Sequence, residues 1–353
     1  MSERRLYRFI PVCVLTLVVG CVFALPSIYA ETLWQIGTFN SSSGEFNTDK
    51  QGPPLFGQRF PKGELVYVVG KSSPEQDWPA YQPGSANGRA GFVPHPYTIQ
   101  FDLAEVPRGL VTLKVSLLVE TPRIPRLGVE INGHRASFYR HPLPDYNGGD
   151  RQLVVSPIAA ADTVVAEINP DFLLKGTNKL VLTAIDGSAE RDDFTSGGVY
   201  YDAIAMEHDS SARFNKGFVK MDVTPTVFYV RKREGLTELV DVLVRSNQPF
   251  ASGQLTLRLG KQTFTQKLSA DREFGEDVAE FTVPEFAPNT PAEVTVKIGG
   301  KTRQITATVS PAKKWLMYVV PHEHLDVGYS DFQAKVSEVQ SRAVDEAIEM
   351  IQT

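Results

Sequence analysis

Cysteine is almost absent from this chain of 353 residues, which has only Cys13 and Cys21. Both lie in a leader that we expect to be removed, so the mature chain has no cysteine with which to form a disulfide. Its domains must therefore be stabilised by hydrophobic cores that stand alone. A chain of this length has room for two or three domains.

A strong excess of one charge is also missing, since 36 Lys and Arg residues face 41 Asp and Glu residues. No basic stripe appears along the chain, and this argues against nucleic acid as a partner. Internal repeats and low-complexity segments are absent too, which excludes solenoid architectures and long disordered tails.

The long apolar run of the chain lies at its N-terminus. Three arginines precede an apolar stretch at residues 10–25, and Ile28-Tyr29-Ala30 offers a cleavage site before Glu31. This order predicts a signal peptide over residues 1–30 and a secreted or periplasmic protein of a bacterial envelope. Val18-Val19-Gly20-Cys21 also fits a lipoprotein box. Lipidation and an uncleaved anchor stay open as alternatives, and we expect membrane contact only through one of them.

Residues 31–209 show a β pattern, in which short strands alternate with turns rich in Gly, Pro, Asn and Asp. Asn132-Gly133 is a strong signal for a hairpin turn. The pattern predicts an antiparallel β-sandwich of jelly-roll type. Its clearest strand candidates are residues 64–69, 97–103, 109–120, 126–131, 178–184 and 200–207.

A second β unit is predicted over residues 217–311, after a polar linker at 208–216. Gly299-Gly300 indicates a tight hairpin between its last two strands. Seven short strands in fewer than 100 residues favour an immunoglobulin-like β-sandwich, which we expect to act as a spacer. These strands are predicted at residues 227–230, 238–245, 254–259, 262–268, 279–283, 292–298 and 303–309.

The tail, residues 314–353, has a different pattern. An apolar strand is predicted over residues 314–320 and an amphipathic helix over residues 332–352. Such a βα unit belongs in a parallel α/β sheet or barrel and cannot bury its own faces. The fold class that we expect is therefore mostly β: a jelly-roll sandwich, an immunoglobulin-like sandwich and one βα unit of an incomplete α/β barrel.

Metal chemistry is suggested by His322, His324 and Asp326, which alternate between that strand and that helix. In an extended backbone their side chains point the same way, and imidazole and carboxylate groups are suitable zinc ligands. A chance triplet on a polar loop is the alternative.

Sugar binding is the second chemistry that the sequence suggests. Trp78 and Tyr81 lie in a loop rich in Pro and Gly, where exposed rings could stack on a pyranose. The alternative is that Trp78 packs within its own loop as a structural residue. Asp202, with nearby loop carboxylates, could hold a structural calcium ion.

The stretch His322-Glu323-His324-Leu325-Asp326-Val327-Gly328-Tyr329 resembles the opening of the catalytic barrel of family-38 glycoside hydrolases, the retaining α-mannosidases. The resemblance covers about 35 residues. It implies that His324 and Asp326 bind zinc and that Tyr329, where the family has Trp, lines the sugar subsite. The family's nucleophile, its general acid and its other zinc ligands have no counterpart here. The resemblance therefore implies only a partial zinc site and no catalytic residue, and we expect the chain by itself to be inactive.

A second resemblance covers about 175 residues. Leu33-Trp34-Gln35-Ile36-Gly37-Thr38-Phe39-Asn40, Ile131-Asn132-Gly133-His134 and Tyr200-Tyr201-Asp202-Ala203-Ile204 are similar to segments of the carbohydrate-binding-like domain III of family-4 polysaccharide lyases, the rhamnogalacturonan lyases. This implies a jelly-roll module that binds a polysaccharide or glycan and does not itself imply lyase activity.

Together these patterns predict the N-terminal fragment of an exported α-mannosidase-like hydrolase that carries a carbohydrate-binding module. Two alternatives stay open. One is a non-catalytic carbohydrate-binding protein, and the other is an accessory part of a rhamnogalacturonan-degrading enzyme.

Overall fold

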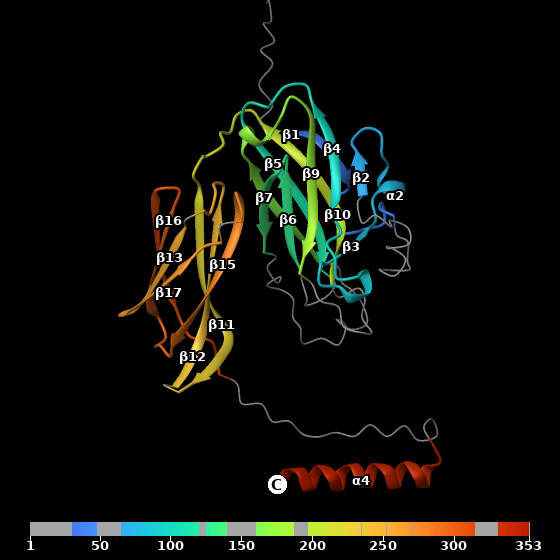
Figure 1. Cartoon of the computed structure of the whole chain (residues 1–353), viewed down its shortest axis with the longest axis vertical. Helices are drawn as coiled ribbons and strands as arrows, with labels where there is room; N and C mark the ends of the chain where they lie inside the picture. Colours follow the sequence, from blue (N-terminus) through green and yellow to red (C-terminus); the bar gives the residue numbers. More distant parts are fainter. Residues whose placement is uncertain are drawn as a thin grey trace, which may run out of the picture. The chain divides into compact units, whose positions relative to one another are not determined.

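The structure is a computed structural model that describes residues 30–47, 65–119, 125–139, 160–186, 197–233, 235–251, 253–269, 271–314 and 331–352. The chain divides into two compact units, Met1–Ser310 and Pro311–Thr353. The first unit consists mostly of strands and the second contains a helix (Figure 1). The predicted fold class, mostly β with sandwiches and one C-terminal helix, is confirmed.

The first sandwich is built from two facing sheets. One sheet has the order β1 (Glu31–Gly37), β10 (Gly198–Asp209), β5 (Leu110–Val119) and β8 (Ala160–Ile168), with β3 (Tyr81–Pro83) also pairing with β10. The other contains β7 (His134–Phe138), β6 (Arg126–Ile131), β9 (Gly176–Ile185), β4 (Tyr97–Leu103) and β2 (Leu65–Val68). Short helical turns connect them: α2 (Pro74–Asp77), η1 (Gly88–Ala90) and η2 (Pro170–Phe172).

Alternation along the strands produces the core between these two sheets. In β5, Leu113, Val115 and Leu117 are fully buried, and they alternate with residues of the outer face. Because successive side chains of a strand point to opposite faces, one face of β5 is apolar and packs inward. Each such side chain contributes about 1.5–3 kcal/mol relative to an exposed one.

The second sandwich has the seven strands that the sequence predicted. One sheet contains β11 (Val219–Lys232), β12 (Gly235–Ser246) and β15 (Phe274–Pro284). The other has the order β14 (Gln262–Lys267), β13 (Gln254–Leu259), β16 (Thr290–Ile298) and β17 (Lys301–Val309). Gly299 and Gly300, with φ of 54° and 72°, form the predicted turn between β16 and β17. A separate apolar cluster, which includes Val242, Leu257 and Val294, fills the space between the sheets.

The two sandwiches share a sheet. β15 pairs with β7 in parallel, through Phe274 with Ala136 and Gly275 with Ser137. One sheet of eight strands therefore runs from β11 through β12, β15 and β7 to β2 (Figure 1). The linker lies two residues further along the chain than predicted, because β10 continues to Asp209 and β11 begins at Val219.

The second unit contains α4 (Gln333–Gln352), within one residue of the predicted start. The carboxylate of Asp331 accepts a hydrogen bond of 2.8 Å from the Phe332 N–H, and Glu338 pairs with Lys335 and Arg342 along the helix. The expected strand at 314–320 and its motif fall almost entirely within residues 315–330, outside the described residues. Residues 1–29 of the expected signal peptide lie outside them too. In the parts of the chain that the structure describes, no helix has the length and apolar character needed to cross a membrane.

Candidate functional site

Trp78 belongs to the core of the first sandwich. Its side chain is 0% exposed, and its ring contacts Tyr97 and Tyr201 edge-on with centroids 5.1 and 5.3 Å apart. Stacking on a sugar needs an open ring face, which Trp78 does not present. The sequence predicted an exposed Trp78 ring, and the structure corrects this. The loop folds inward, because the Asn47 N–H donates to the Trp78 carbonyl oxygen and the Ala80 N–H donates to the Asn47 carbonyl oxygen.

Tyr81 is also buried, on the short strand β3. It is 9% exposed, and its ring lies 5.0 Å from that of Tyr200. Its hydroxyl oxygen accepts a hydrogen bond of 3.2 Å from the Asn87 side-chain amide. Trp78 and Tyr81 therefore pack on successive residues of β10, Tyr201 and Tyr200, which point to opposite faces of the sheet, and neither ring is open to a ligand.

A buried polar cluster underlies these rings. The Gln82 amide donates to the carbonyl oxygens of His95 and Leu182 at 2.6 and 2.9 Å, and the Tyr201 hydroxyl donates to Gln82 Oε1 at 2.7 Å. Burial lowers the pKa of His95 below its ordinary value, because the charged imidazolium loses hydration. Burial likewise raises the pKa of Tyr97. These polar groups bond to one another and hold the core in register.

Asp202 has a structural role that the calcium hypothesis did not anticipate. One of its carboxylate oxygens accepts hydrogen bonds from the N–H groups of Asn40 and Ser42 at 3.1 and 3.0 Å. The other accepts a bond of 2.7 Å from the Ser116 hydroxyl. Among the described residues, no group of three His, Cys, Asp or Glu side chains could hold a metal ion. The zinc-site candidates His324 and Asp326, and the aromatic Tyr329, lie outside those residues.

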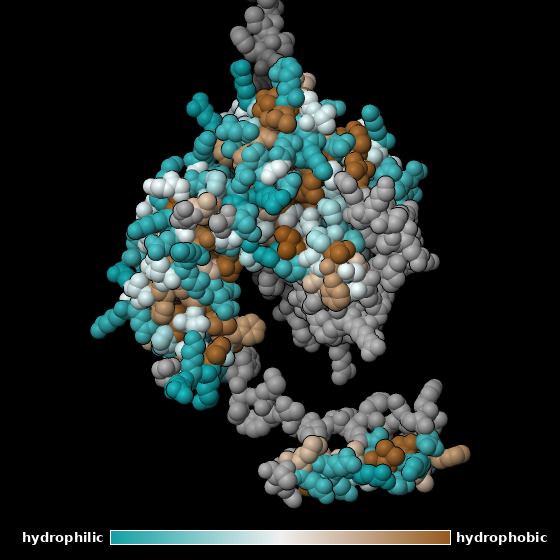
Figure 2. Space-filling view, viewed as in Figure 1, coloured by the Kyte–Doolittle hydropathy of each residue, from teal (hydrophilic) through white to brown (hydrophobic). Residues whose placement is uncertain are grey.

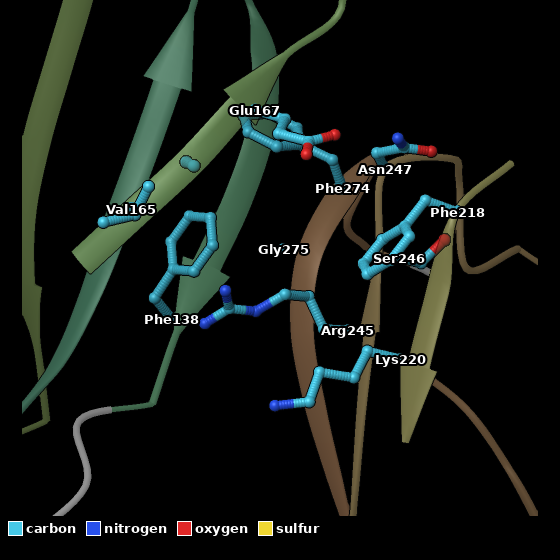
Figure 3. A pocket seen from close by; sticks show the side chains of 11 residues that line it. Phe138, Val165, Glu167, Phe218, Lys220, Arg245, Ser246, Asn247, Phe274 and Gly275 are labelled. Atoms are coloured by element: carbon cyan, nitrogen blue, oxygen red, sulfur yellow. The ribbon is translucent and has the colours of Figure 1, made fainter. Parts of the chain in front are cut away.

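A cleft lies where the two sandwiches meet, and we call it the junction cleft. Its volume is about 170 Å³. Strands of both sandwiches form its walls (Figure 3). It is lined by Phe138, Val165, Ala166, Glu167, Phe218, Lys220, Arg245, Ser246, Asn247, Phe274 and Gly275.

The charges of the junction cleft are distributed between its two ends. Figure 3 shows Glu167 near Asn247 at one end, with the side chains of Arg245 and Lys220 toward the other. The guanidinium of Arg245 lies 5.9 Å from the Phe138 ring centre and donates two hydrogen bonds, of 2.8 and 2.5 Å, to the buried carboxylate of Glu276. The charge of Arg245 is therefore balanced within the protein.

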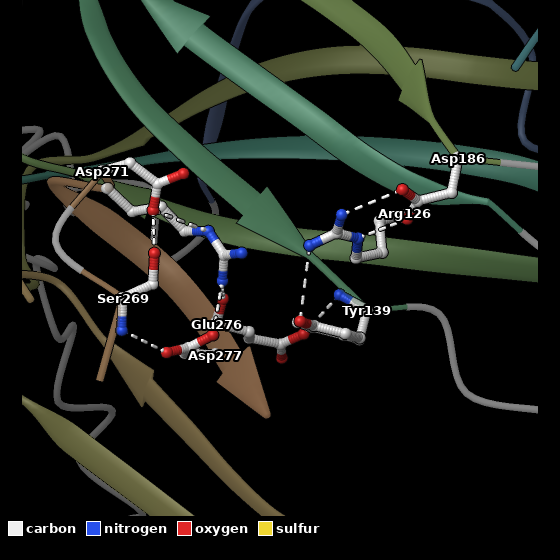
Figure 4. A network of polar contacts seen from close by, with 8 residues as sticks. Arg126, Tyr139, Asp186, Ser269, Asp271, Glu276 and Asp277 are labelled. Atoms are coloured by element: carbon white, nitrogen blue, oxygen red, sulfur yellow. Dashed lines mark hydrogen bonds and ion pairs between the residues drawn. The ribbon is translucent and has the colours of Figure 1, made fainter. Parts of the chain in front are cut away.

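A polar network beside this cleft ties the sandwiches together (Figure 4). The Tyr139 N–H donates a hydrogen bond of 2.8 Å to Oε2 of Glu276, the carboxylate oxygen that Arg245 does not contact. Arg272 pairs with Asp277 at 2.9 Å. In the first sandwich, Arg126 donates to both oxygens of Asp186, and these bonds raise the pKa of Arg126. Of these bonds, the one from the Tyr139 N–H to the Glu276 carboxylate crosses the junction, which is thus held by a charged hydrogen bond as well as by the shared sheet.

The sequence pointed to no residue of the junction cleft as a site. Most of its residues come from β7, β8, β11, β12 and β15, and Phe218 and Asn247 lie next to β11 and β12; β7 and β8 are far from the other three strands along the chain. Because the sequence predicted the second sandwich to be a spacer, it did not predict that Lys220 and Arg245 line a site. Only the parallel pairing of β7 with β15 brings these side chains together, and no local pattern predicts such a pairing.

Residues 32–206 match a family model described as CBM-like, polysaccharide lyase family 4, domain III. The first sandwich is therefore a carbohydrate-binding-like domain, as its resemblance implied. No curated protein matches the chain.

Solved structures of glycoside hydrolases share a low level of similarity with the chain. A GH2 β-galacturonidase from Eisenbergiella tayi is 12% identical with a TM-score of 0.21, over 61% of this chain and 35% of that one. The β-glucuronidase of Ruminococcus gnavus is 12% identical with a TM-score of 0.19, over 61% and 35%. The exo-chitosanase of Amycolatopsis orientalis is 13% identical with a TM-score of 0.20, over 62% and 25%. The chain spans about a third or less of these proteins, and similarity this low says nothing about activity.

Proposed function

We propose that this chain is the N-terminal part of an exported glycoside hydrolase of the α-mannosidase type, in which the first sandwich is an accessory carbohydrate-binding module. The match of residues 32–206 to a CBM-like family model is the observation that carries the carbohydrate-binding part. The α-mannosidase part rests on the resemblance of the stretch from His322 to Tyr329.

The donor set of that stretch fits zinc. His324 offers an imidazole nitrogen and Asp326 a carboxylate oxygen, and in an extended segment both side chains lie on one side. A bound zinc ion would supply a Lewis acid that holds two sugar hydroxyls. Catalytic zinc sites take about three ligands from the protein, so His324 and Asp326 form part of a site. Tyr329 would contribute an aromatic ring beside the sugar.

The apolar face of α4 supports a larger α/β domain. Val339 and Met350, eleven residues apart and so on the same side of the helix, are 50% and 72% exposed. Figure 2 shows brown, apolar side chains at the surface of this helix. In an α/β domain such a face packs against the parallel sheet. Each Å² of apolar surface that this packing removes from water stabilises the domain by about 25 cal/mol. The face therefore favours packing against further strands of a barrel.

Affinity electrophoresis of the full chain tests carbohydrate binding. The chain is run through gels that contain yeast α-mannan or pectic rhamnogalacturonan, with serum albumin as a reference that does not bind. We expect α-mannan to retard the chain relative to a gel without polysaccharide. Equal mobility in both polysaccharide gels, together with no retention on an array of plant and microbial glycans, would exclude the binding function.

Hydrolysis is tested separately. We expect the full chain, supplied with zinc, to release no p-nitrophenol from p-nitrophenyl α-mannoside above the rate of buffer, because the chain lacks the nucleophile and the general acid of a retaining glycosidase. Turnover above that rate would contradict the partial-site interpretation.

A second candidate function is an accessory role in rhamnogalacturonan degradation. The observation that favours it is the family model itself, which describes a domain of polysaccharide lyases. Retardation by rhamnogalacturonan and not by mannan would support this function over the α-mannosidase type.

A further inference from the structure

We propose that the junction cleft binds one neutral pyranose unit of a glycan. The inference rests on the proposed carbohydrate binding and gives it a location. The location differs from the aromatic loop at Trp78 and Tyr81, whose rings are buried. It also makes the second sandwich a part of the binding site.

The size of the junction cleft suits a single sugar ring. Its volume of about 170 Å³ lies below the ~300 Å³ at which pockets for drug-sized ligands begin. It therefore accommodates one ring, with its open side leaving room for the neighbouring units of a chain.

Its apolar surface matches the faces of a pyranose. Val165 is 42% exposed and Phe218 is half-buried, so both present apolar surface to the cleft, whereas Phe138 is only 2% exposed and supports the wall beside Val165. In Figure 3, Val165 and Phe138 lie on one side of the cleft and Phe218 on the other. The carbon-bound hydrogens of a sugar ring pack against such groups, which contribute affinity through burial.

The polar side chains of the junction cleft can form hydrogen bonds with sugar hydroxyls. The Glu167 carboxylate accepts no hydrogen bond from any residue that the structure describes, and it lines one end of the cleft. The ammonium of Lys220, a donor only, lines the same cleft. A hydroxyl can both donate and accept, and a pyranose carries several hydroxyls, so one can donate to Glu167 at one end of the cleft while another accepts from Lys220 toward the other end.

The balance of charge favours a neutral sugar over a uronate. Arg245 is paired with the fully buried Glu276, and Lys220 lies 3.4 Å from the exposed carboxylate of Asp222, which leaves Glu167 as the lining charge with no ion pair to a described residue. A sugar carboxylate would be attracted by Lys220 but repelled by Glu167, and it cannot donate a hydrogen bond to that carboxylate.

The cleft is formed before a ligand arrives. The pairing of Gly275 with Ser137 fixes β15 against β7, and Glu276 holds both the Tyr139 N–H and Arg245. Walls from two sandwiches are thus kept at a constant separation. A preformed site loses less affinity to ordering on binding.

A filling substitution and a matched control test the site. Val165→Trp places a large ring in the cleft. Val66→Trp makes the same change at a valine that is also 42% exposed, on β2 at the edge of the other sheet. Both variants, in the full chain, are compared with wild type by affinity electrophoresis in α-mannan and in rhamnogalacturonan. We expect Val165→Trp to lose at least about tenfold in affinity for the polysaccharide that retards wild type, a change of about 1.4 kcal/mol, and Val66→Trp to behave as wild type.

A second variant covers a failure of Val165→Trp to fold, which circular dichroism would reveal. Glu167→Gln keeps the shape of the side chain and removes its charge, and we expect roughly three- to tenfold weaker binding from a weaker acceptor. Displacement from the gel by free sugars then tests the ligand class. We expect methyl α-D-mannopyranoside or L-rhamnose to displace the chain at lower concentration than D-galacturonate does.

The outcomes separate the two proposals. If neither polysaccharide nor any arrayed glycan retains wild type, the proposed function fails and the site fails with it. If wild type is retarded and folded Val165→Trp and Glu167→Gln are retarded equally, the site alone is overturned and the binding function stands. Stronger displacement by galacturonate would overturn the neutral class.

Discussion

Asp202 is the residue on which the loop after β1 depends. Its buried carboxylate accepts hydrogen bonds from the Asn40 and Ser42 N–H groups and from the Ser116 hydroxyl. The Asn40 and Ser42 N–H groups lie in the loop after β1, where no neighbouring strand among the described residues supplies a backbone acceptor. Without Asp202, the N–H groups would lose their acceptor, and a buried donor without an acceptor costs about 1–3 kcal/mol.

We therefore predict that Asp202→Ala lowers the free energy of unfolding by about 3 kcal/mol. Asp102→Ala is the control, since Asp102 is exposed and accepts one hydrogen bond, from the Thr177 hydroxyl. Its expected change stays within about 0.5 kcal/mol. Urea unfolding at pH 7 measures both variants. An equally small loss at Asp202 would show that the loop does not depend on the carboxylate.

At the scale of elements, β12 and β15 contain an unfavourable pair. Asp241 lies directly opposite Glu280 in the antiparallel register. Burial, and then the charge of Glu280, raise the pKa of Asp241 above its ordinary value. The folded state therefore binds this proton more tightly than the unfolded state, so ionisation costs stability. The cost is absent below the unfolded pKa of about 3.9 and is complete above the folded pKa.

We predict that Asp241→Asn raises the free energy of unfolding at pH 7 by about 0.5 kcal/mol, because it removes a like-charge pair that is partly screened by solvent. The gain should vanish below about pH 3.9, where Asp241 is protonated in both states. Thermal unfolding across this pH range measures it. Asp222→Asn, at an exposed carboxylate that pairs with Lys220 at 3.4 Å, is the control and should bring no gain. A gain at Asp241 that does not depend on pH would contradict the electrostatic cause.

Strands with clear alternation were predicted to the residue. β4, β6 and β13 have the bounds expected from the sequence, because apolar and polar residues alternate along them and turn residues flank them. β8 was missed although Asn169-Pro170 follows it directly, because its Ala, Asp and Glu residues have low strand propensity, and β3 is only three residues long. β11 is far longer than residues 227–230, because its pairing with β12 extends through polar residues.

At the scale of the whole molecule, a glycine allows the two sandwiches to join. Gly275 has a φ of +95°, and a Cβ atom there would lie 2.6 Å from the Ser137 carbonyl oxygen. Any larger residue at position 275 must therefore adopt a strained backbone and also push β15 away from β7. The shared sheet makes us expect a single cooperative unfolding transition for both sandwiches.

We predict that Gly275→Ala costs about 3 kcal/mol and divides that transition into two, one for each sandwich. Gly133→Ala is the matched control. Gly133 has a similar φ of +91°, but nothing lies within 4 Å of its Cβ position. It should cost about 1 kcal/mol from backbone strain alone and leave one transition. Differential scanning calorimetry measures both. Equal losses and a single transition in both variants would show that the close approach at Gly275 does not hold the junction.

The sequence by itself determined the β character of the chain, the seven strands of the second sandwich, the glycine turns and the C-terminal helix. These features follow from periodicity and turn chemistry, which act over a few residues. Only the tertiary structure decided that Trp78 and Tyr81 are buried, that Asp202 binds backbone N–H groups, and that β15 joins β7 beside a cleft. Burial and pairing between distant strands depend on the packing of the whole chain, and local patterns do not encode them.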